Sequence, residues 1–437
     1  MRTTAHTTLA MLVISIGAFS GCDWIWGKQL KAGFCDEHPT DSECPPIDAG
    51  SDGPDSCSSS TQCEAPTAVC DLGAMTCVEC TPAEAGACVG MMPVCGDDRA
   101  CRACEAHSEC ASSACLPDGS CADPGVVAYV SPTGTDNASC SQAMPCTDVA
   151  DALATGRAYV KISGTNDEGG TIAIDNQNVT ILADPGAKIV RTSNGIVLEV
   201  KGTSRVTIYD LEISGGSGAQ GIGISMPAGN TATLTLSRAR ISENAGGGID
   251  TSGGTLTLSR STVSGNAGGG ISISGGQFDI TNTFIVQNGG AGSTFGGIEI
   301  GNITGSGTRR LDFNTISANQ APATVNTGVS CGTVLTALVF ANNIIYGNIV
   351  AGGGRQVGGS AMCSVIYSDV GPDMATGTGN INQDPQFIAP AQGNFHLAST
   401  SPAKDVADPA ATLSFDVDGE ARPQGAGRDM GADEIVP

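Results

Sequence analysis

The sequence is poor in aromatic and basic residues. Aromatic side chains make up 4% of the 437 residues and glycine occurs 61 times, which suits thin stacked coils better than a globular core filled by aromatic rings. Lysine and arginine number 20 against 44 aspartate and glutamate residues, so the net charge is −24. This charge argues against electrostatic binding of nucleic acid or of anionic lipid headgroups. We expect a monomer with no nucleic-acid partner.

Near the N-terminus, an apolar run from Leu9 to Phe19 is too short to span a bilayer. It follows Arg2 and ends in Phe19-Ser20-Gly21-Cys22, which predicts a signal peptide over residues 1–21. The ending resembles the lipobox of bacterial lipoproteins, with Phe19 where leucine is usual. The resemblance implies lipidation of Cys22, a membrane tether over residues 22–34 and a lipid-anchored protein of the cell envelope, with the outer membrane or cell surface favoured. An ordinary signal peptide with a chance cysteine is the alternative.

The 19 cysteines become an even set once Cys22 is set aside, and an even set in an exported chain implies disulfides. Most lie in residues 35–124, where Cys35 and Cys44 stand apart as disulfide candidates. Twelve others form three sets of four, which are Cys57, Cys63, Cys70, Cys77; Cys80, Cys88, Cys95, Cys101; and Cys104, Cys110, Cys115, Cys121. Segments this short cannot build an adequate hydrophobic core, so we predict a disulfide-rich repeat module. It resembles the Cys-rich repeats of proteins secreted by predatory and soil bacteria. The pairing within each set stays open, and zinc at the CxxC pairs is the alternative.

A repeat of 22 residues lies further along the chain. Ile241-Ser-Glu-Asn244 recurs as Val263-Ser-Gly-Asn266 and as Ile285-Val-Gln-Asn288. A fixed period of this length, with β-branched residues and glycine turns, is typical of a solenoid that winds one coil per repeat. The spacing widens after Asn288, which predicts longer loops in the coils between Gly289 and Gly359.

Aliphatic residues predict three inward columns, one for each sheet of a three-sided coil. One strand position is assigned to Val160-Lys-Ile162, Val179-Thr-Ile181, Val206-Thr-Ile208, Leu234-Thr-Leu236, Leu256-Thr-Leu258 and Phe278-Asp-Ile280. A second column is Ile213, Ile241, Val263, Ile285, Ile316 and Ile345, and a third is Ile222, Ile249, Ile271 and Ile298. At one turn, a hydrogen-bonded ladder is expected of Asn244, Asn266, Asn288, Asn319 and Asn348.

Both ends of this region carry further signatures. The strand-like Val126–Val130, followed by a short helical segment at Val149–Leu153, resembles the N-terminal cap of right-handed parallel β-helix proteins of the pectate-lyase-like superfamily. The resemblance implies an all-β, right-handed parallel β-helix solenoid over residues 125–437, with N-terminal and C-terminal caps and preceded by the small disulfide-rich module. A disulfide between Cys140 and Cys146 is expected in the N-terminal cap, and the last pair is expected between Cys331 and Cys363 in late coils.

The C-terminal region contains Asp416-Val-Asp418-Gly419-Glu-Ala-Arg422-Pro423 and Asp429-Met-Gly431-Ala432-Asp-Glu434. These motifs closely resemble the end of bacterial surface β-helix proteins known as choice-of-anchor Q domain proteins. The resemblance covers Val126 to Pro437 and implies a fold and an exported setting, not a reaction. Asp416-Val-Asp418-Gly419 looks like the start of a calcium loop, but the later ligands are missing, so a capping turn is favoured. We predict no metal site and no cofactor, with Ca²⁺ as the alternative.

The local motifs of polysaccharide lyases and of the glycoside hydrolases on this fold do not occur in the sequence. His396 is predicted to be a structural residue of the C-terminal cap. The strongest enzyme-like cluster combines Arg238, Arg240 and Arg260 with acidic residues, among them Asp250. A solvated salt-bridge ladder on adjacent coils is the favoured interpretation. Phe284 and Ile344 fall at outward positions, where they either line an apolar strip or lie under a loop.

The favoured function is therefore non-catalytic: surface display of a β-helix for adhesion, glycan binding or surface structure. The expected partners are a membrane, reached through the lipid anchor, and a polysaccharide or cell-surface glycan. A polysaccharide lyase or glycoside hydrolase is the alternative, and it needs two converging carboxylates or a Ca²⁺ site beside arginine or lysine. A structural spacer without a ligand is the third possibility.

Overall fold

The computed structural model describes residues 56–436 except 302, 304–306, 323–326, 333–336, 351–354, 361 and 374. The expected signal peptide and tether, with Cys22, Cys35 and Cys44, lie outside the described residues. The chain forms two compact units, Met1–Arg102 and Ala103–Pro437. The boundary between them separates the first two sets of four cysteines from the third set, which belongs to the second unit.

In its described part, the first unit contains two short antiparallel strand pairs. They are β1 (Val69–Asp71) with β2 (Thr76–Val78) and β3 (Val94–Cys95) with β4 (Cys101–Arg102), accompanied by the 3₁₀ turns η1 (Ser60–Gln62) and η2 (Pro82–Ala87). In each set the first cysteine pairs with the third and the second with the fourth: Cys57–Cys70, Cys63–Cys77, Cys80–Cys95 and Cys88–Cys101. The third set repeats this order as Cys104–Cys115 and Cys110–Cys121. The CxxC cysteines are therefore used in disulfides rather than in zinc sites.

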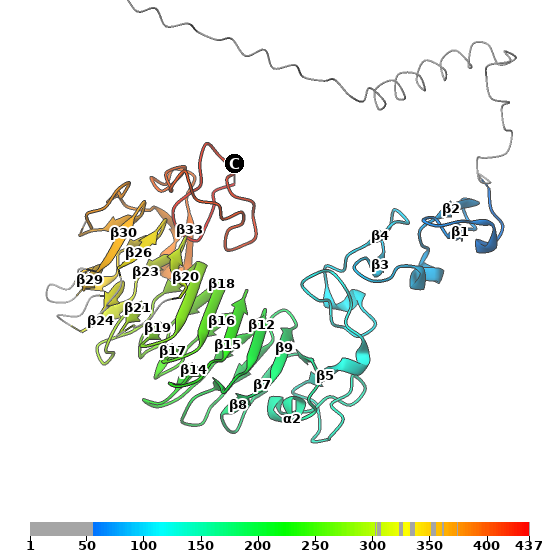
Figure 1. The fold of residues 1–437 in the computed structure, drawn as a ribbon, viewed down its shortest axis with the longest axis horizontal. Helices are drawn as coiled ribbons and strands as arrows, with labels where there is room; N and C mark the ends of the chain where they lie inside the picture. The colour runs from blue at the N-terminus through cyan, green and yellow to red at the C-terminus, as the bar shows by residue number, and fades with distance from the viewer. Residues whose placement is uncertain are drawn as a thin grey trace, which may run out of the picture. The chain divides into compact units, whose positions relative to one another are not determined.

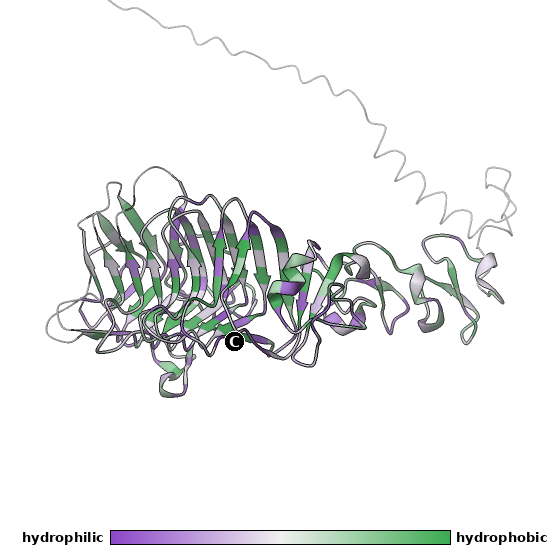
Figure 2. Cartoon of the chain, turned by 90° about the horizontal axis from the view of Figure 1, so that it is seen from below, coloured by the Kyte–Doolittle hydropathy of each residue, from purple (hydrophilic) through white to green (hydrophobic). Residues whose placement is uncertain are grey.

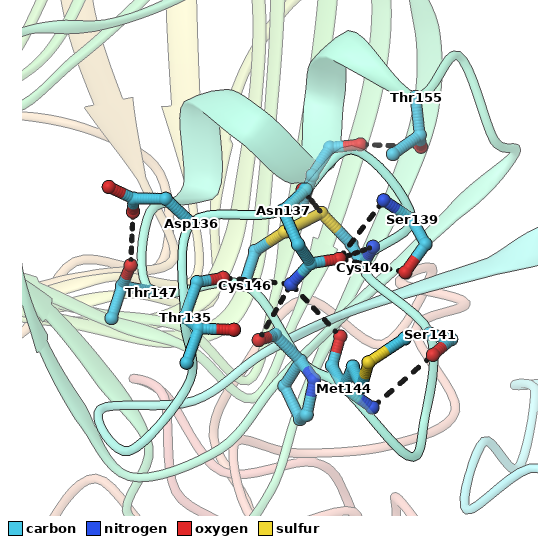
Figure 3. Close-up of a disulfide and its surroundings, with 12 residues drawn as sticks. Thr135, Asp136, Asn137, Ser139, Cys140, Ser141, Met144, Cys146, Thr147 and Thr155 are labelled. Atoms are coloured by element: carbon cyan, nitrogen blue, oxygen red, sulfur yellow. Dashed lines mark hydrogen bonds between the residues drawn. A yellow bond between two sulfur atoms is a disulfide. The ribbon is translucent and has the colours of Figure 1, made fainter.

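The second unit begins with the short turns η3 (His107–Glu109) and η4 (Pro124–Val126), then strand β5 (Val127–Val130) and helix α2 (Val149–Ala154). Helix α2 buries Val149 and Leu153 against the first coil. The loop between β5 and α2 contains the expected Cys140–Cys146 disulfide. Figure 3 shows the Asn137 side chain at the centre of this loop, where its amide donates to the carbonyls of Thr135, Met144 and Pro145.

The coils that follow form three parallel sheet faces, as Figure 1 shows. The first face contains β5, β6 (Tyr159–Ile162), β9 (Asn178–Ala183), β12 (Arg205–Tyr209), β15 (Thr233–Ser237), β18 (Thr255–Ser264), β20 (Gln277–Val286), β22 (Arg309–Asp312), β26 (Leu338–Ala341) and β30 (Cys363–Ile366). The second contains β7 (Thr165–Asp167), β10 (Lys188–Val190), β13 (Glu212–Ser214), β16 (Arg240–Ser242), the second halves of β18 and β20, β23 (Thr315–Ser317), β27 (Ile344–Tyr346) and β31 (Asp369–Gly371). The third contains β8 (Ile172–Asp175), β11 (Leu198–Lys201), β14 (Ile222–Met226), β17 (Gly247–Thr251), β19 (Ile271–Ile273), β21 (Ile298–Ile300), β25 (Val329–Cys331) and β29 (Val357–Gly359). The remaining strands pair as β24 (Gln320–Ala321) with β28 (Ile349–Val350) and, on either side of η5 (Pro390–Gln392), β32 (Phe387–Ala389) with β33 (Asn394–Leu397).

This architecture confirms the predicted all-β, right-handed parallel β-helix preceded by a disulfide-rich region. Hydrophobic and hydrophilic residues alternate along the strands (Figure 2), which places one row of side chains inside each coil. One buried cluster of aliphatic side chains extends from Ala128 to Val370. The Cys331–Cys363 disulfide lies in the late coils, as expected.

The strand registers confirm the second predicted column throughout, since Ile213, Ile241, Val263, Ile285, Ile316 and Ile345 pair in order. Two assignments in the other columns were wrong. Ile249 pairs with Ile224 rather than with Ile222, and Val160 pairs with Ile181 rather than with Val179. Both errors are slips of two residues, which leave the same strand face inward, so the alternation of residues could not reveal them.

The expected asparagine ladder is present and fully bonded. Each asparagine from Asn244 to Asn319 donates through Nδ2 to the Oδ1 of the next one, at distances of 2.8–3.0 Å. Asn348 ends the ladder by donating to Gln356 Oε1 at 2.7 Å. A second ladder, which the sequence did not reveal, links Thr283, Asn314, Asn343, Ser368 and Asn380 at the turn between the first two faces. At both turns, buried backbone N–H groups therefore donate to side-chain oxygens of the next coil along the axis, so they are not left without partners.

The C-terminal segment covers the outer side of the second face. Phe284 packs with Phe395, Val417 and Ala432, while Ile344 packs with Leu397, Ala403 and Met430. Phe284 is 8% exposed and Ile344 is fully buried. The two outward apolar residues therefore lie under the C-terminal segment and do not form an open strip.

Candidate functional site

The third set of cysteines packs beside the first coils and leaves a cavity of about 760 Å³. One wall is the segment from Cys104 to Pro117, and the other consists of the ends of β9 and β12 with the turns that follow β9, β12 and β15. Apolar atoms of Leu116 and Leu182 contribute to the lining together with charged groups from successive coils. This volume is typical of pockets that hold small ligands or a few sugar units.

Arg238 pairs with a carboxylate in the pocket lining. Its Nε and Nη2 donate to the two oxygens of Asp210, at 2.6 and 2.7 Å. The guanidinium also lies 5.5 Å from the centre of the Tyr209 ring. The hydrogen bond to Asp210 raises the pKa of Arg238, so the cation stays charged at all physiological pH values. Stacking and bidentate pairing together fix the orientation of this side chain.

Asp210 and Arg238 occupy the same turn position on successive coils, with backbone φ angles of 63° and 53°. Arg260 follows in the next coil with φ 50°. The left-handed backbone conformation at this position of each coil directs the three side chains outward from one corner of the solenoid. The shared turn position was the available signal for Asp210, which the sequence analysis did not single out.

A second ion pair lies on the same wall of the pocket, one coil before Asp210. Lys161 is only 3% exposed, and its Nζ donates to Asp184, which lines the pocket. His107 is nearby, and its Nδ1 accepts the backbone N–H of Cys115 at 3.0 Å. Burial and, secondarily, the charge of Lys161 lower the pKa of His107, so the imidazole is neutral at pH 7. Glu105 is the remaining acidic residue of the lining and is exposed.

The four residues of the predicted surface cluster occupy four separate environments. Arg238 lines the pocket, whereas Arg240 points from β16 toward Glu212, with a 4.0 Å ion pair. Arg260 instead donates to the carbonyls of Val417 and Asp418 in the C-terminal segment. Asp250 lies on β17 in the third face, where it pairs in register with Ser272 rather than with any of the arginines.

The Asp416 turn has the geometry of a cap. Asp416 Oδ1 accepts the backbone N–H groups of Asp418, Gly419 and Glu420, and Oδ2 accepts that of Glu434. Because backbone donors occupy both oxygens, this carboxylate is not a free calcium ligand. Nearby, Arg422 donates to Asp429 O and Glu434 Oε2, both at 3.0 Å, which completes the buried polar cap.

Basic side chains pair with two of the acidic groups in the pocket lining. Hydrolysis of a glycosidic bond requires one protonated carboxyl group and a second, free carboxylate. In this pocket Arg238 occupies both oxygens of Asp210 and Lys161 holds Asp184, whereas the Glu105 carboxylate is exposed. Ordered charged groups beside apolar atoms can instead bind adjacent sugar hydroxyls by hydrogen bonding.

Comparison with family models agrees with the fold. A family model described as a right handed beta helix region matches residues 160–285. Pectate lyase Pel9A is a similar solved structure, with 13% sequence identity, a TM-score of 0.44, and coverage of 70% of this chain and 96% of that one. A likeness of this size says nothing about activity. Among curated proteins, none matches this chain.

Two findings bear on location. The disulfides indicate that the chain folds in an oxidising, extracellular compartment. Within the part of the chain that the structure describes, every helix is too short or too polar to cross a membrane.

Proposed function

We propose that this is an exported, lipid-anchored envelope protein that binds a glycan without cleaving it. The observation that carries the proposal is the pocket beside the first coils, with its paired Arg238 and Asp210. A rigid solenoid supports one wall, and the disulfides Cys104–Cys115 and Cys110–Cys121 brace the other. Binding to such a preformed site costs little conformational entropy.

The ligand we expect is a short stretch of a glycan chain with vicinal hydroxyl groups. The Arg238 guanidinium and the Asp210 carboxylate are joined by two hydrogen bonds, and together they can donate to and accept from neighbouring hydroxyls. The lining also includes the exposed Glu105 and the half-exposed Asp184, so strongly anionic glycans are disfavoured by like charge. Neutral or amino sugars are therefore the preferred class.

A glycan array with the full-length protein tests this proposal. Wild type is expected to bind a defined subset of glycans, and Arg238→Ala to weaken that binding at least tenfold. Arg240→Ala is the matched control, because it also removes an arginine two residues away but lies outside the pocket lining. It should change the affinity by less than twofold. Equal loss in both variants, or no bound glycan at all, would rule out the pocket as a glycan site.

The lipid anchor is a separate part of the proposal and has its own test. We expect Cys22→Ala to leave the protein unlipidated, so that it moves from the membrane fraction to the aqueous fraction. Cys35→Ser is the control, since it removes a cysteine outside the lipobox-like sequence. Continued membrane partition of Cys22→Ala would show that the anchor assignment is wrong.

A further inference from the structure

Three side chains with metal-binding atoms meet in the C-terminal cover of the solenoid. They are His396 on β33, Asp418 in the turn after Asp416, and Asp433 near the end of the chain. One ligand atom from each lies within 4.8 Å of the other two. The His396 and Asp418 side chains are 34% and 52% exposed, whereas Asp433 is 5% exposed. The group is thus anchored on one side and open to solvent on the other.

The hydrogen bonds of His396 define its tautomer. Asn394 Oδ1 accepts the backbone N–H of His396 at 3.0 Å, which identifies that atom as the amide oxygen. The same oxygen lies 2.6 Å from His396 Nδ1, so Nδ1 carries a proton and donates it. Nε2 then has a free lone pair, yet it lies 2.8 Å from Asp418 Oδ2, which is also an acceptor. Two acceptors at this distance require a cation or an additional proton between them.

The negative charge around His396 is only partly compensated. The carboxylates of Asp416, Asp418, Glu420 and Asp433 lie close enough to one another to interact electrostatically. The adjacent cation, Arg260, directs its hydrogen bonds to the carbonyl oxygens of Val417 and Asp418 instead of to a carboxylate.

We propose that His396 Nε2, Asp418 and Asp433 bind one divalent transition-metal ion, with Zn²⁺ as the best match. One imidazole and two carboxylates suit such an ion, whereas Ca²⁺ takes six to eight oxygen ligands. Bonds of about 2.1 Å to a tetrahedral ion place the donor atoms about 3.4 Å apart. The present separations, from 2.8 Å between His396 and Asp418 to at most 4.8 Å within the group, lie on either side of this value. Asn394 supplies the outer hydrogen bond that orients the imidazole, as is usual for a ligating histidine.

The bound ion would join three segments that are distant in sequence. Strand β33, the Asp416 turn and the segment around Asp433 all cover the second face of the solenoid, where Phe395, Val417 and Ala432 pack on Phe284. The backbone N–H of Leu397, on the strand that carries His396, donates to Asp433 Oδ2 at 2.7 Å. The ion would therefore fasten the C-terminal cover, independently of any glycan in the pocket beside the first coils.

Calorimetric titration of the full-length, disulfide-bonded protein with ZnCl₂ tests the proposal, after treatment with a chelator. Wild type is expected to bind one ion per chain at this site and to gain in Tm. His396→Gln and Asp418→Asn should each weaken the binding at least tenfold. Asp384→Asn is the matched control, because it also removes an exposed carboxylate from the C-terminal region but lies outside the three-residue group. It should bind with an affinity within twofold of wild type.

Circular dichroism of each variant separates lost binding from lost folding. Asp418 is exposed, so Asp418→Asn is expected to fold normally even without metal. If wild type takes up no stoichiometric Zn²⁺, or if both ligand variants bind as well as Asp384→Asn, the metal site is refuted.

Discussion

In the first unit the buried hydrophobic residues are mostly cysteines, whereas in the solenoid they are stacked aliphatic side chains. Among the described residues up to Arg102, the buried hydrophobic set is Cys57, Val69, Cys70, Cys80 and Cys88. The solenoid instead has a continuous aliphatic interior and two ladders of polar side chains along its turns. In a chain with few aromatic residues, disulfides can thus stabilise one region and the stacking of similar coils another. The two regions should therefore unfold under different conditions.

The largest expected difference is the response to reduction. Each native disulfide typically contributes about 2–5 kcal/mol, and the first unit has little else to bury. We expect a reductant to remove hydrogen-exchange protection from Cys57–Cys101, while strands β12 to β20 stay protected. Hydrogen exchange followed by mass spectrometry measures both regions in one sample. Retained protection in the first unit after complete reduction would contradict this account of its stability.

The next largest effect is expected from breaking the first ladder. Asn266 is fully buried, accepts from Asn244 Nδ2 and donates to Ile241 O and Asn288 Oδ1. Asn266→Ala leaves these groups without partners, so we expect a loss of about 4 kcal/mol in the free energy of unfolding. Thr257→Ala, an outward residue of a neighbouring strand, should change it by less than about 0.5 kcal/mol. Urea unfolding compares the two, and similar losses would mean that the ladder does not stabilise the solenoid.

A smaller effect, dependent on pH, is expected at the N-terminal cap. Glu168 is 4% exposed and accepts the N–H of Val149 at the start of α2. Burial raises the pKa of Glu168 from 4.5 to about 7. A carboxyl group with a raised pKa in the folded state binds more protons than in the unfolded state, so stability falls as the pH rises from about 4.5 to about 7.

Glu168→Gln keeps the acceptor and removes the titration. The variant should match wild type near pH 4 and exceed it above pH 7 by at most about 3 kcal/mol. Burial raises the pKa values of Asp369 and Asp429 to about 6, so the free energy of unfolding should still fall with rising pH in both proteins, but less steeply in the variant. Measurement of the unfolding free energy of both proteins at several pH values tests the prediction. A variant with the wild-type pH profile would exclude Glu168 as a source of the dependence.

The smallest effect is expected at the outward charges of the second face. The Arg240 side chain is 55% exposed and its ion pair with Glu212 is long, at 4.0 Å. Arg240→Ala should therefore change the free energy of unfolding by less than about 0.5 kcal/mol. A loss above 1 kcal/mol in urea unfolding would show that surface charges, as well as the interior and the ladders, stabilise the coils.

The regular coils were the most predictable part of the molecule. Where the spacing is 22 residues, β-branched aliphatic residues recur at the same structural position, so Ile241, Val263 and Ile285 identify a column directly. The second ladder escaped prediction because Thr283, Asn314 and Ser368 are different residues with one role. Only the strand register reveals that they are equivalent.

The candidate sites were less predictable than the fold because they depend on contacts between distant segments. The pocket forms because the segment from Cys104 to Pro117 packs beside β9 and β12. No short sequence pattern predicts that packing. Likewise, His396 and Asp433 meet through the return of the chain over the second face. The sequence predicted His396 as a structural residue of the cap but not the carboxylates that face it.

Recovery of the bound glycan tests the central claim most directly. The full-length protein is incubated with the glycan that it binds best, and the ligand is then released and analysed by mass spectrometry. We predict that wild type returns the glycan intact, that Arg240→Ala does the same, and that Arg238→Ala retains almost none. A glycan returned with new reducing or unsaturated ends would contradict the account and identify the protein as an enzyme.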